Sequence, residues 1–233
     1  LYTNTTGDKN TAIGTDSMQF NTTGNRNAAL GYRSLYVNTT GYYNSAVGHE
    51  SLWSNTTGYE NTGLGTQALY SNTTGWDNTA VGSRALWGNT SGTQNTAIGQ
   101  LALHNNTTGY SNIAIGVDTM AANTTGGRNI AIGNSAISSN ISGDYNVAIG
   151  YQAGYSALGS TNVFLGYQAG YNETGSNKLY ISNDDSTNLL YGDFSTGQLD
   201  LGQTSGTVTI LNDADVDGTL ALGDLTDVES SIN

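Results

Sequence analysis

The chain has 233 residues, of which 32 are Gly and only 10% are charged, and it contains neither Pro nor Cys. Asn, Thr and Gly dominate, so no segment carries enough large apolar residues for a conventional compact core, whereas 15 Tyr and regularly spaced Ile, Val and Leu argue against disorder. The formal charge of −12 disfavours nucleic acid as a partner, no disulfide can form, and no apolar run approaches the ~18 residues that membrane insertion requires.

A tetrad of sequence N-T-T-G recurs with a constant period of 17 from the start of the chain. A second Asn follows the first within each unit, as Asn10 follows Asn4, and then an aliphatic residue precedes Gly, as in Ile13 and Gly14. Such a fixed period is typical of a repeat architecture. The first Asn of each tetrad, counting the near copies N-T-S-G and N-I-S-G, is Asn4, Asn21, Asn38, Asn55, Asn72, Asn89, Asn106, Asn123 or Asn140.

Each unit predicts one coil of a β-solenoid. Two glycines and many Asn and Thr leave no stretch for a helix. The segment T-A-I-G alternates, so Thr11 and Ile13 face one way and Ala12 the other. We therefore predict an all-β roll in which each 17-residue coil has two short strands and two turns, and coils stack about 4.8 Å apart. Stacking would place the repeated Asn side chains in amide ladders.

A single roll of this kind is expected to be marginally stable. Each coil buries only about two large aliphatic residues, which offsets a small part of the conformational entropy lost on ordering the coil. Three rolls side by side would share a core, so we expect a parallel homotrimer, with a monomeric roll as the alternative. A rank of small residues suits the contact between chains: Ala12, Ala29, Ala46, Ala80, Ala97, Ala114, Ala131 and Ala148.

The repeats resemble those of known fibrous proteins. The units N-T-A-I-G-x-x-A-L-x-x-N-T-T-G, followed by V-F-L-G-Y-Q-A-G-Y-N-E-T-G-S-N-K-L-Y-I-S-N and L-L-Y-G-D-F-S-T-G, are similar to repeat regions of bacterial and phage tail-fibre-like proteins. Those proteins often end in a self-cleaving intramolecular chaperone that drives trimerisation. The A-I-G-x-x-A core also resembles the left-handed β-roll repeats of trimeric autotransporter adhesin heads. The resemblance covers residues 4 to about 194 and implies a left-handed, trimeric roll at a virion or cell surface.

The chain divides into three predicted regions. The solenoid occupies residues 1–171, with a one-residue slip at Asn162, which follows Asn146 at a spacing of 16 instead of 17. Residues 172–211 form an irregular β transition, in which 172–182 end in a strand and 189–194, 197–201 and 206–211 are further short strands. Residues 212–233 include a strand at 218–222 and begin a further stalk or coiled coil, because the spacing of Leu225, Val228 and Ile232 is three and then four.

Aromatic residues recur at two positions of the repeat, so stacking would gather them into stripes along the roll. Flat aromatic stripes suit sugar rings, and the alternative is that stacked rings only seal the edge of the solenoid or the seam between chains. The first stripe is Tyr36, Trp53, Tyr70 and Trp87, continued by His104. The second is Tyr42, Tyr59, Trp76 and, after a gap at Thr93, Tyr110.

Other chemistry has weaker support. Asp213, Asp215, Asp217 and Asp224 partly match a calcium-binding loop, although Asp224 stands where a Glu is usual, and solvated acids in a turn are the alternative. One Thr of each N-T-T-G could line an ice- or surface-binding face. With two His, no G-x-S-x-G turn and no facing carboxylate pair, we expect no enzyme and no cofactor.

These observations predict a structural and adhesive segment of an extracellular trimeric fibre, either a tail fibre or a surface adhesin, that binds a surface polysaccharide. The first alternative is a polysaccharide-degrading spike with an active site built between chains. The second is an ice- or surface-binding protein.

Overall fold

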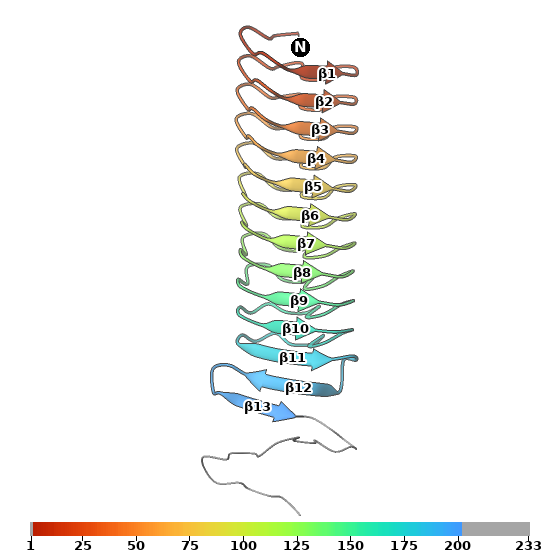
Figure 1. Cartoon of the computed structure of the whole chain (residues 1–233), viewed down its shortest axis with the longest axis vertical. Helices are drawn as coiled ribbons and strands as arrows, with labels where there is room; N and C mark the ends of the chain where they lie inside the picture. The colour runs from red at the N-terminus through yellow and green to blue at the C-terminus, as the bar shows by residue number, and fades with distance from the viewer. Residues whose placement is uncertain (1, 202–233) are drawn as a thin grey trace, which may run out of the picture. The chain divides into compact units, whose positions relative to one another are not determined.

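The computed structural model describes residues 2–201, which form strands and turns without a helix. One sheet contains all the strands in sequence order, and Figure 1 shows them stacked from β1 to β13. The predicted all-β solenoid of 17-residue coils with parallel strands is therefore confirmed. The strands are β1 (Thr11–Ile13), β2 (Ala28–Leu30), β3 (Ser45–Val47), β4 (Thr62–Leu64), β5 (Thr79–Val81), β6 (Thr96–Ile98), β7 (Ile113–Ile115), β8 (Ile130–Ile132), β9 (Val147–Ile149), β10 (Val163–Leu165), β11 (Lys178–Ser182), β12 (Asn188–Asp193) and β13 (Gln198–Leu201).

The repeat converts directly into strand register. From β1 to β9 each strand pairs in parallel with its equivalent one full repeat further along the chain, as Thr79 does with Thr96. β10 pairs with β9 and β11 at a spacing of 16, since Val163 lies opposite Val147 and Leu179. The one-residue slip predicted at Asn162 is thus absorbed without breaking the stack.

Each coil contains one strand, and the prediction of two was wrong. The opposite side of the coil is a run of turns, whose amides still bond to the next coil, as Met18 N donates to Ser34 O at 3.0 Å. Asp16 and Met18 on that side have positive φ angles of 57° and 49°. Residues in the left-handed region cannot continue a pleated strand, because a strand requires φ near −120°.

Left-handed backbone at residues other than Gly recurs three times in each of the coils of β1–β8. In the coil of β4 and its neighbouring turns, Glu60, Gln67 and Leu69 have φ angles of 56°, 56° and 53°. This conformation costs roughly 1 kcal/mol or more for a residue with a side chain. The ladder of hydrogen bonds to both neighbouring coils holds these residues in place.

The alanines of the strands point inward, opposite to their predicted role between chains. Ala29, Ala46, Ala80 and Ala97 are at most 1% exposed inside the roll. The aliphatic residues beside them point outward, and Ile13 is 58% exposed. The two sides of a strand alternate as expected. In β10 the inward residue is the fully buried Phe164, whose ring packs against Gly154 and Gly170. In β1–β8 the inward strand position holds Ala or Gly63, and the opposite wall supplies one large apolar residue in each coil. Those large core residues are Met18, Leu35, Leu52, Leu69, Leu86, Leu103, Met120 and Ile137.

Two Asn ladders lie in the core, as predicted, beside a buried rank of Ser, Ala and Thr residues. In the first, Asn38 Nδ2 donates to Asn21 Oδ1 at 2.7 Å and to Gly41 O at 3.1 Å, while its own Oδ1 accepts from Asn55 Nδ2 at 2.8 Å. All the first Asn residues from Asn21 to Asn140 are fully buried. Because each amide has partners above and below, the polar core carries little desolvation penalty.

The second Asn ladder bonds to the backbone as well as to itself. Asn61 donates its backbone N–H to Asn44 Oδ1 at 3.1 Å, and its Nδ2 donates to the same Oδ1 at 3.1 Å and to Gly75 O at 2.8 Å. The side chain therefore replaces the turn hydrogen bonds that a short coil cannot make with its own backbone.

We expect Ile137→Val and Ile141→Val to differ in stability, because one residue lies in the core and the other on the surface. Ile137 is fully buried, whereas Ile141 in the next tetrad is 53% exposed. Removing one methyl group from the core should lower the free energy of unfolding by about 1 kcal/mol at Ile137 and by much less at Ile141. Urea denaturation of both variants measures this, and equal losses would contradict the assignment of the core.

The last strands run differently and close the described part of the roll. β12 pairs antiparallel with β11, and β13 pairs antiparallel with β12. Lys178 Nζ lies 2.5 Å from Asp193 Oδ2 across the β11–β12 pair, and this contact holds the pKa of Asp193 well below its ordinary value. Partial burial disfavours ionised Glu173, but hydrogen bonds from the Tyr180 hydroxyl and the Gly175 amide lower its pKa overall.

The strands predicted at 189–194 and 197–201 correspond to β12 and β13, with bounds that differ by one residue. The parallel stack runs on to Ser182, beyond residue 171. The predicted strands at 206–211 and 218–222, and the stalk at 212–233, lie outside the described residues.

Candidate aromatic binding surface

The first predicted aromatic stripe is a stacked ladder on the turn side of the coils. Ring centroids of Tyr36 and Trp53 are 5.7 Å apart with planes 13° from parallel, and Trp53 and Tyr70 are 5.3 Å apart at 7°. Trp87 and His104 continue the ladder at 5.8 Å and 5.2 Å. Phe20 closes its first end by packing edge-on against Tyr36 at 5.0 Å.

The second predicted stripe is a ladder of three rings just before the strands. Tyr42 and Tyr59 stack at 4.9 Å and 5°, and Tyr59 and Trp76 stack at 5.8 Å and 2°. Thr93 interrupts it in the next coil, as the sequence predicted. Tyr110 lies one coil further on.

Stacking limits what these ladders can offer to a sugar. Parallel rings with centroids 4.9–5.8 Å apart cannot lie side by side in one plane, because a ring is wider than that, so they overlap in the offset-stacked arrangement. Both faces of an inner ring such as Tyr59 are then covered by its neighbours. A pyranose can stack only on a ring face, so the stripe predicted as a platform offers ring faces only where a ladder ends or is interrupted.

Tyr110 is held rigidly at one side of such an interruption. The guanidinium of Arg128 lies 4.9 Å from the Tyr110 ring centroid, and Arg128 Nη1 donates to the Tyr110 hydroxyl at 2.9 Å and to the Tyr145 hydroxyl at 2.6 Å. A Cβ atom on Gly127 would come within 2.8 Å of the Tyr110 ring, so the ring packs directly on that glycine. One face of Tyr110 is therefore occupied.

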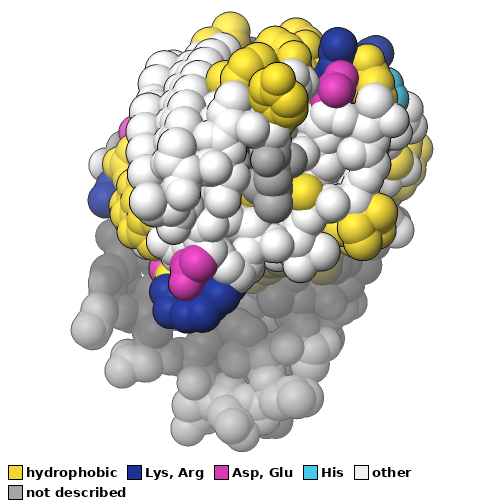
Figure 2. Space-filling view, turned by 90° about the horizontal axis from the view of Figure 1, so that it is seen from above, with side chains coloured by type: hydrophobic (Ala, Val, Ile, Leu, Met, Phe, Trp, Pro, Cys, Tyr) yellow, Lys and Arg dark blue, Asp and Glu magenta, His cyan; other side chains and the backbone are white. Residues whose placement is uncertain are grey.

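Four further stacked pairs were not predicted from the sequence, one of them between Phe164 in the core and Tyr180 at 5.9 Å. Tyr32 stacks on His49 at 5.2 Å, while later in the chain Tyr151 stacks on Tyr167 at 5.4 Å. Tyr155 also stacks on Tyr171 at 5.0 Å. The spacing of aromatic residues could have predicted them. Tyr32 and His49 are one repeat of 17 apart, and the pairs after the slip are 16 apart. Seen along the stack, hydrophobic side chains gather in separate patches around the coil outline rather than cover it (Figure 2).

The two Thr residues of each tetrad differ in how they are held. The first Thr is tied down, since Thr39 Oγ1 donates to Thr56 O at 3.0 Å and its equivalents do the same. The second rank is exposed throughout and comprises Thr6, Thr23, Thr40, Thr57, Thr74, Ser91, Thr108, Thr125 and Ser142. In most tetrads only this rank faces solvent, as expected from the alternation.

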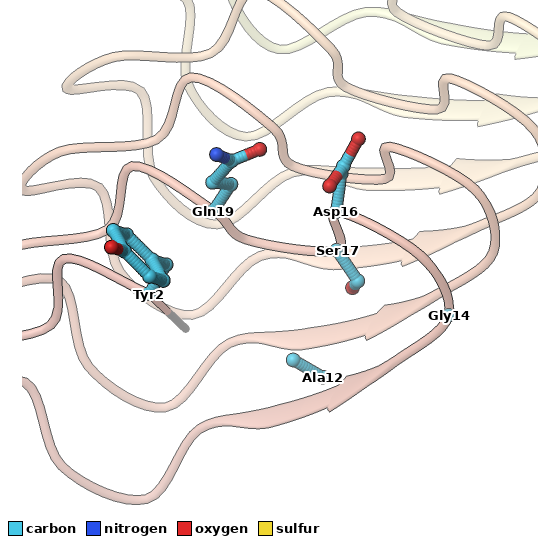
Figure 3. Close-up of a pocket in the computed structure, with 6 residues that line it drawn as sticks. All are labelled: Tyr2, Ala12, Gly14, Asp16, Ser17 and Gln19. Atoms are coloured by element: carbon cyan, nitrogen blue, oxygen red, sulfur yellow. The ribbon is translucent and has the colours of Figure 1, made fainter.

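A hollow of about 230 Å³ lies at the β1 end of the described stack (Figure 3). Tyr2, Ala12, Asp16 and Gln19 are among its lining residues, and Figure 3 shows their side chains around the first turn of the roll. Ala12 and Ser17 here occupy the inward positions that are covered elsewhere by both the preceding and the following coil. The hollow is thus continuous with the interior of the first described coil.

Among residues 2–201, no three His, Cys, Asp or Glu side chains cluster in a way that could hold a metal ion. The calcium candidates Asp213, Asp215, Asp217 and Asp224 lie outside this range. The same range contains no helix able to cross a bilayer.

The described residues define a β-solenoid repeat protein whose outer surface carries aromatic ladders and an aliphatic strand face. No protein-family model, curated protein or solved structure matches the chain.

Proposed function

We propose that this chain is a non-enzymatic, structural and adhesive segment of an extracellular trimeric fibre, a tail fibre or a surface adhesin, which binds surface glycans. The observation that carries the proposal is the outward face of strands β1–β10. One rank of this strand face is aliphatic in every coil, and seven of its ten members are 37–58% exposed. The rank is Ile13, Leu30, Val47, Leu64, Val81, Ile98, Ile115, Ile132, Ile149 and Leu165.

The size and chemistry of the strand face support self-association. Ten coils about 4.8 Å apart and three residues wide give a face of about 500 Å², so two copies would bury about 1,000 Å², the lower limit for a specific interface. Its outward positions contain no charged residue. A second copy has the same coil spacing, so its side chains can interdigitate along the whole length. A narrow face of this kind can contact two neighbours at once if it lies along a threefold axis.

The face becomes more apolar toward β10. In β1–β6 the other outward rank is Thr, Ser or Ala, whereas in β7–β10 it is Ile113, Ile130, Val147 and Val163. Exposed apolar surface of this extent marks an interaction site in most proteins. We therefore assign the strongest contact between chains to the coils of β7–β10, in place of the buried alanines.

Measurement of mass in solution tests the trimer. The wild type should have three times the chain mass of 24.2 kDa, and Ile132→Lys should shift it to the monomer, because a Lys side chain would be desolvated in the contact. Thr125→Lys adds the same charge at an exposed tetrad position and should leave the trimer intact. A wild-type monomer at all concentrations would contradict the proposal.

A further inference from the structure

We propose that the gap at Thr93 in the second aromatic ladder is a binding notch for one ring of a neutral saccharide, held between Trp76 and Tyr110. This inference rests on the adhesive part of the proposed function and locates its site. It concerns one coil only, whereas the contact between chains is assigned to the strand face.

The spacing of the rings in the ladder gives the width of the gap. Each coil accommodates one ring, as Tyr59 and Trp76 do with centroids 5.8 Å apart and planes 2° from parallel. Thr93 replaces the ring in the following coil, so the distance across the gap is two coil spacings, about 10 Å. One ring stacked between two others needs about this space, and two rings need more.

Both walls present a ring face to the gap. Tyr59 covers one face of Trp76, and no other ring within residues 2–201 stacks on it. Gly127 and Arg128 cover one face of Tyr110, and in the same range no ring stacks on the other. Both side chains are half-buried, so their positions are set before a ligand arrives. Preorganised aromatic faces lower the entropic cost of binding.

The floor and rim of the notch are polar. The backbone of the floor is fixed, because Thr93 O accepts from Ser111 N at 2.9 Å and Trp76 O accepts from Gln94 N at 3.0 Å. Asp77 and Gln94 are exposed beside the aromatic positions. Carboxylate and amide groups next to a ring face suit the hydroxyls of a sugar, and the exposed Asp77 carboxylate at the rim disfavours an anionic ligand.

A glycan array of neutral oligosaccharides tests this assignment with three variants. Thr93→Tyr fills the gap with a residue that the same position tolerates in other coils, so we expect a folded protein with a raised Tm and no glycan binding. Trp76→Ala removes one wall and should weaken binding about tenfold. Ala121→Tyr extends the first ladder beyond His104 and should bind as the wild type does, because it adds an equal ring elsewhere.

The outcomes separate the notch from the wider proposal. If Thr93→Tyr and wild type bind the same glycans equally, the notch is wrong and adhesion resides elsewhere. If wild type binds no neutral glycan, the saccharide assignment is overturned, while the trimer is still decided by the measurement of mass in solution. Loss of binding in Thr93→Tyr with retention in Ala121→Tyr supports the notch.

Discussion

Gly82→Ala is expected to lower the free energy of unfolding by about 3 kcal/mol or more. Gly82 directly follows β5 and has a φ angle of +135°, which residues with side chains rarely adopt. A Cβ atom there would lie 2.5 Å from Gly99 O, an atom of the next coil that cannot move without shifting the whole stack. The backbone strain and the steric clash of the new Cβ atom therefore both lower the free energy of unfolding. Thermal or urea unfolding measures the loss.

Gly197→Ala is the matched control for Gly82→Ala. Gly197 also has a positive φ angle, +77°, but a Cβ atom there would meet nothing within 4 Å. Its cost should be the backbone strain alone, about 1 kcal/mol. If the two variants lose the same stability, close approach between coils is not what requires Gly after each strand.

Asn72→Asp should lower the free energy of unfolding by about 3–5 kcal/mol at pH 7. Asn72 Nδ2 donates to Asn55 Oδ1 at 2.8 Å and to Gly75 O at 3.1 Å, and the residue is fully buried. Replacing the amide nitrogen by a carboxylate oxygen turns both hydrogen bonds into repulsive contacts between acceptors. The buried charge has no cation to pair with it among the atoms of the ladder.

The decrease in the free energy of unfolding caused by Asn72→Asp should depend on pH. Burial and the two facing oxygens favour the protonated carboxyl group, so its pKa in the folded protein is raised above the ordinary value of about 3.9. Stability is then highest below that ordinary value and is lost as pH rises through the folded pKa. Thr74→Asp, at an exposed position of the same tetrad, should show no such loss, and urea curves at pH 3 and pH 7 compare the two.

Periodicity made most of the fold predictable. Because the repeat length is constant, sequence alone placed Asn38 beside Asn55, predicted the aromatic ladders and located the slip at Asn162. Alternation within T-A-I-G also separated Ala from its neighbours correctly. These inferences need only the fact that residues one repeat apart lie one above the other in adjacent coils.

What lies inside one coil was harder to predict. Alternation does not say which side is the interior, and we placed Ala12 and its equivalents between chains because a large aliphatic residue ordinarily marks the core. The second strand was wrong because Leu69 and Gln67 take left-handed angles that nothing in their side chains indicates. Whether an aromatic stripe exposes ring faces or ring edges depends on the tilt of the rings, and the spacing of the residues in the sequence does not determine that tilt.

The amide ladders also make the length of the roll adjustable. Each Asn bonds only to the coil on either side, so one whole repeat can be gained or lost with every remaining amide still paired. Gaining or losing a single residue between two coils shifts the amides out of register unless a turn absorbs the change, as it does for the residue lost before Asn162. Duplication of whole units therefore lets evolution set the reach of the molecule in steps of one coil, about 4.8 Å, without redesigning its interior.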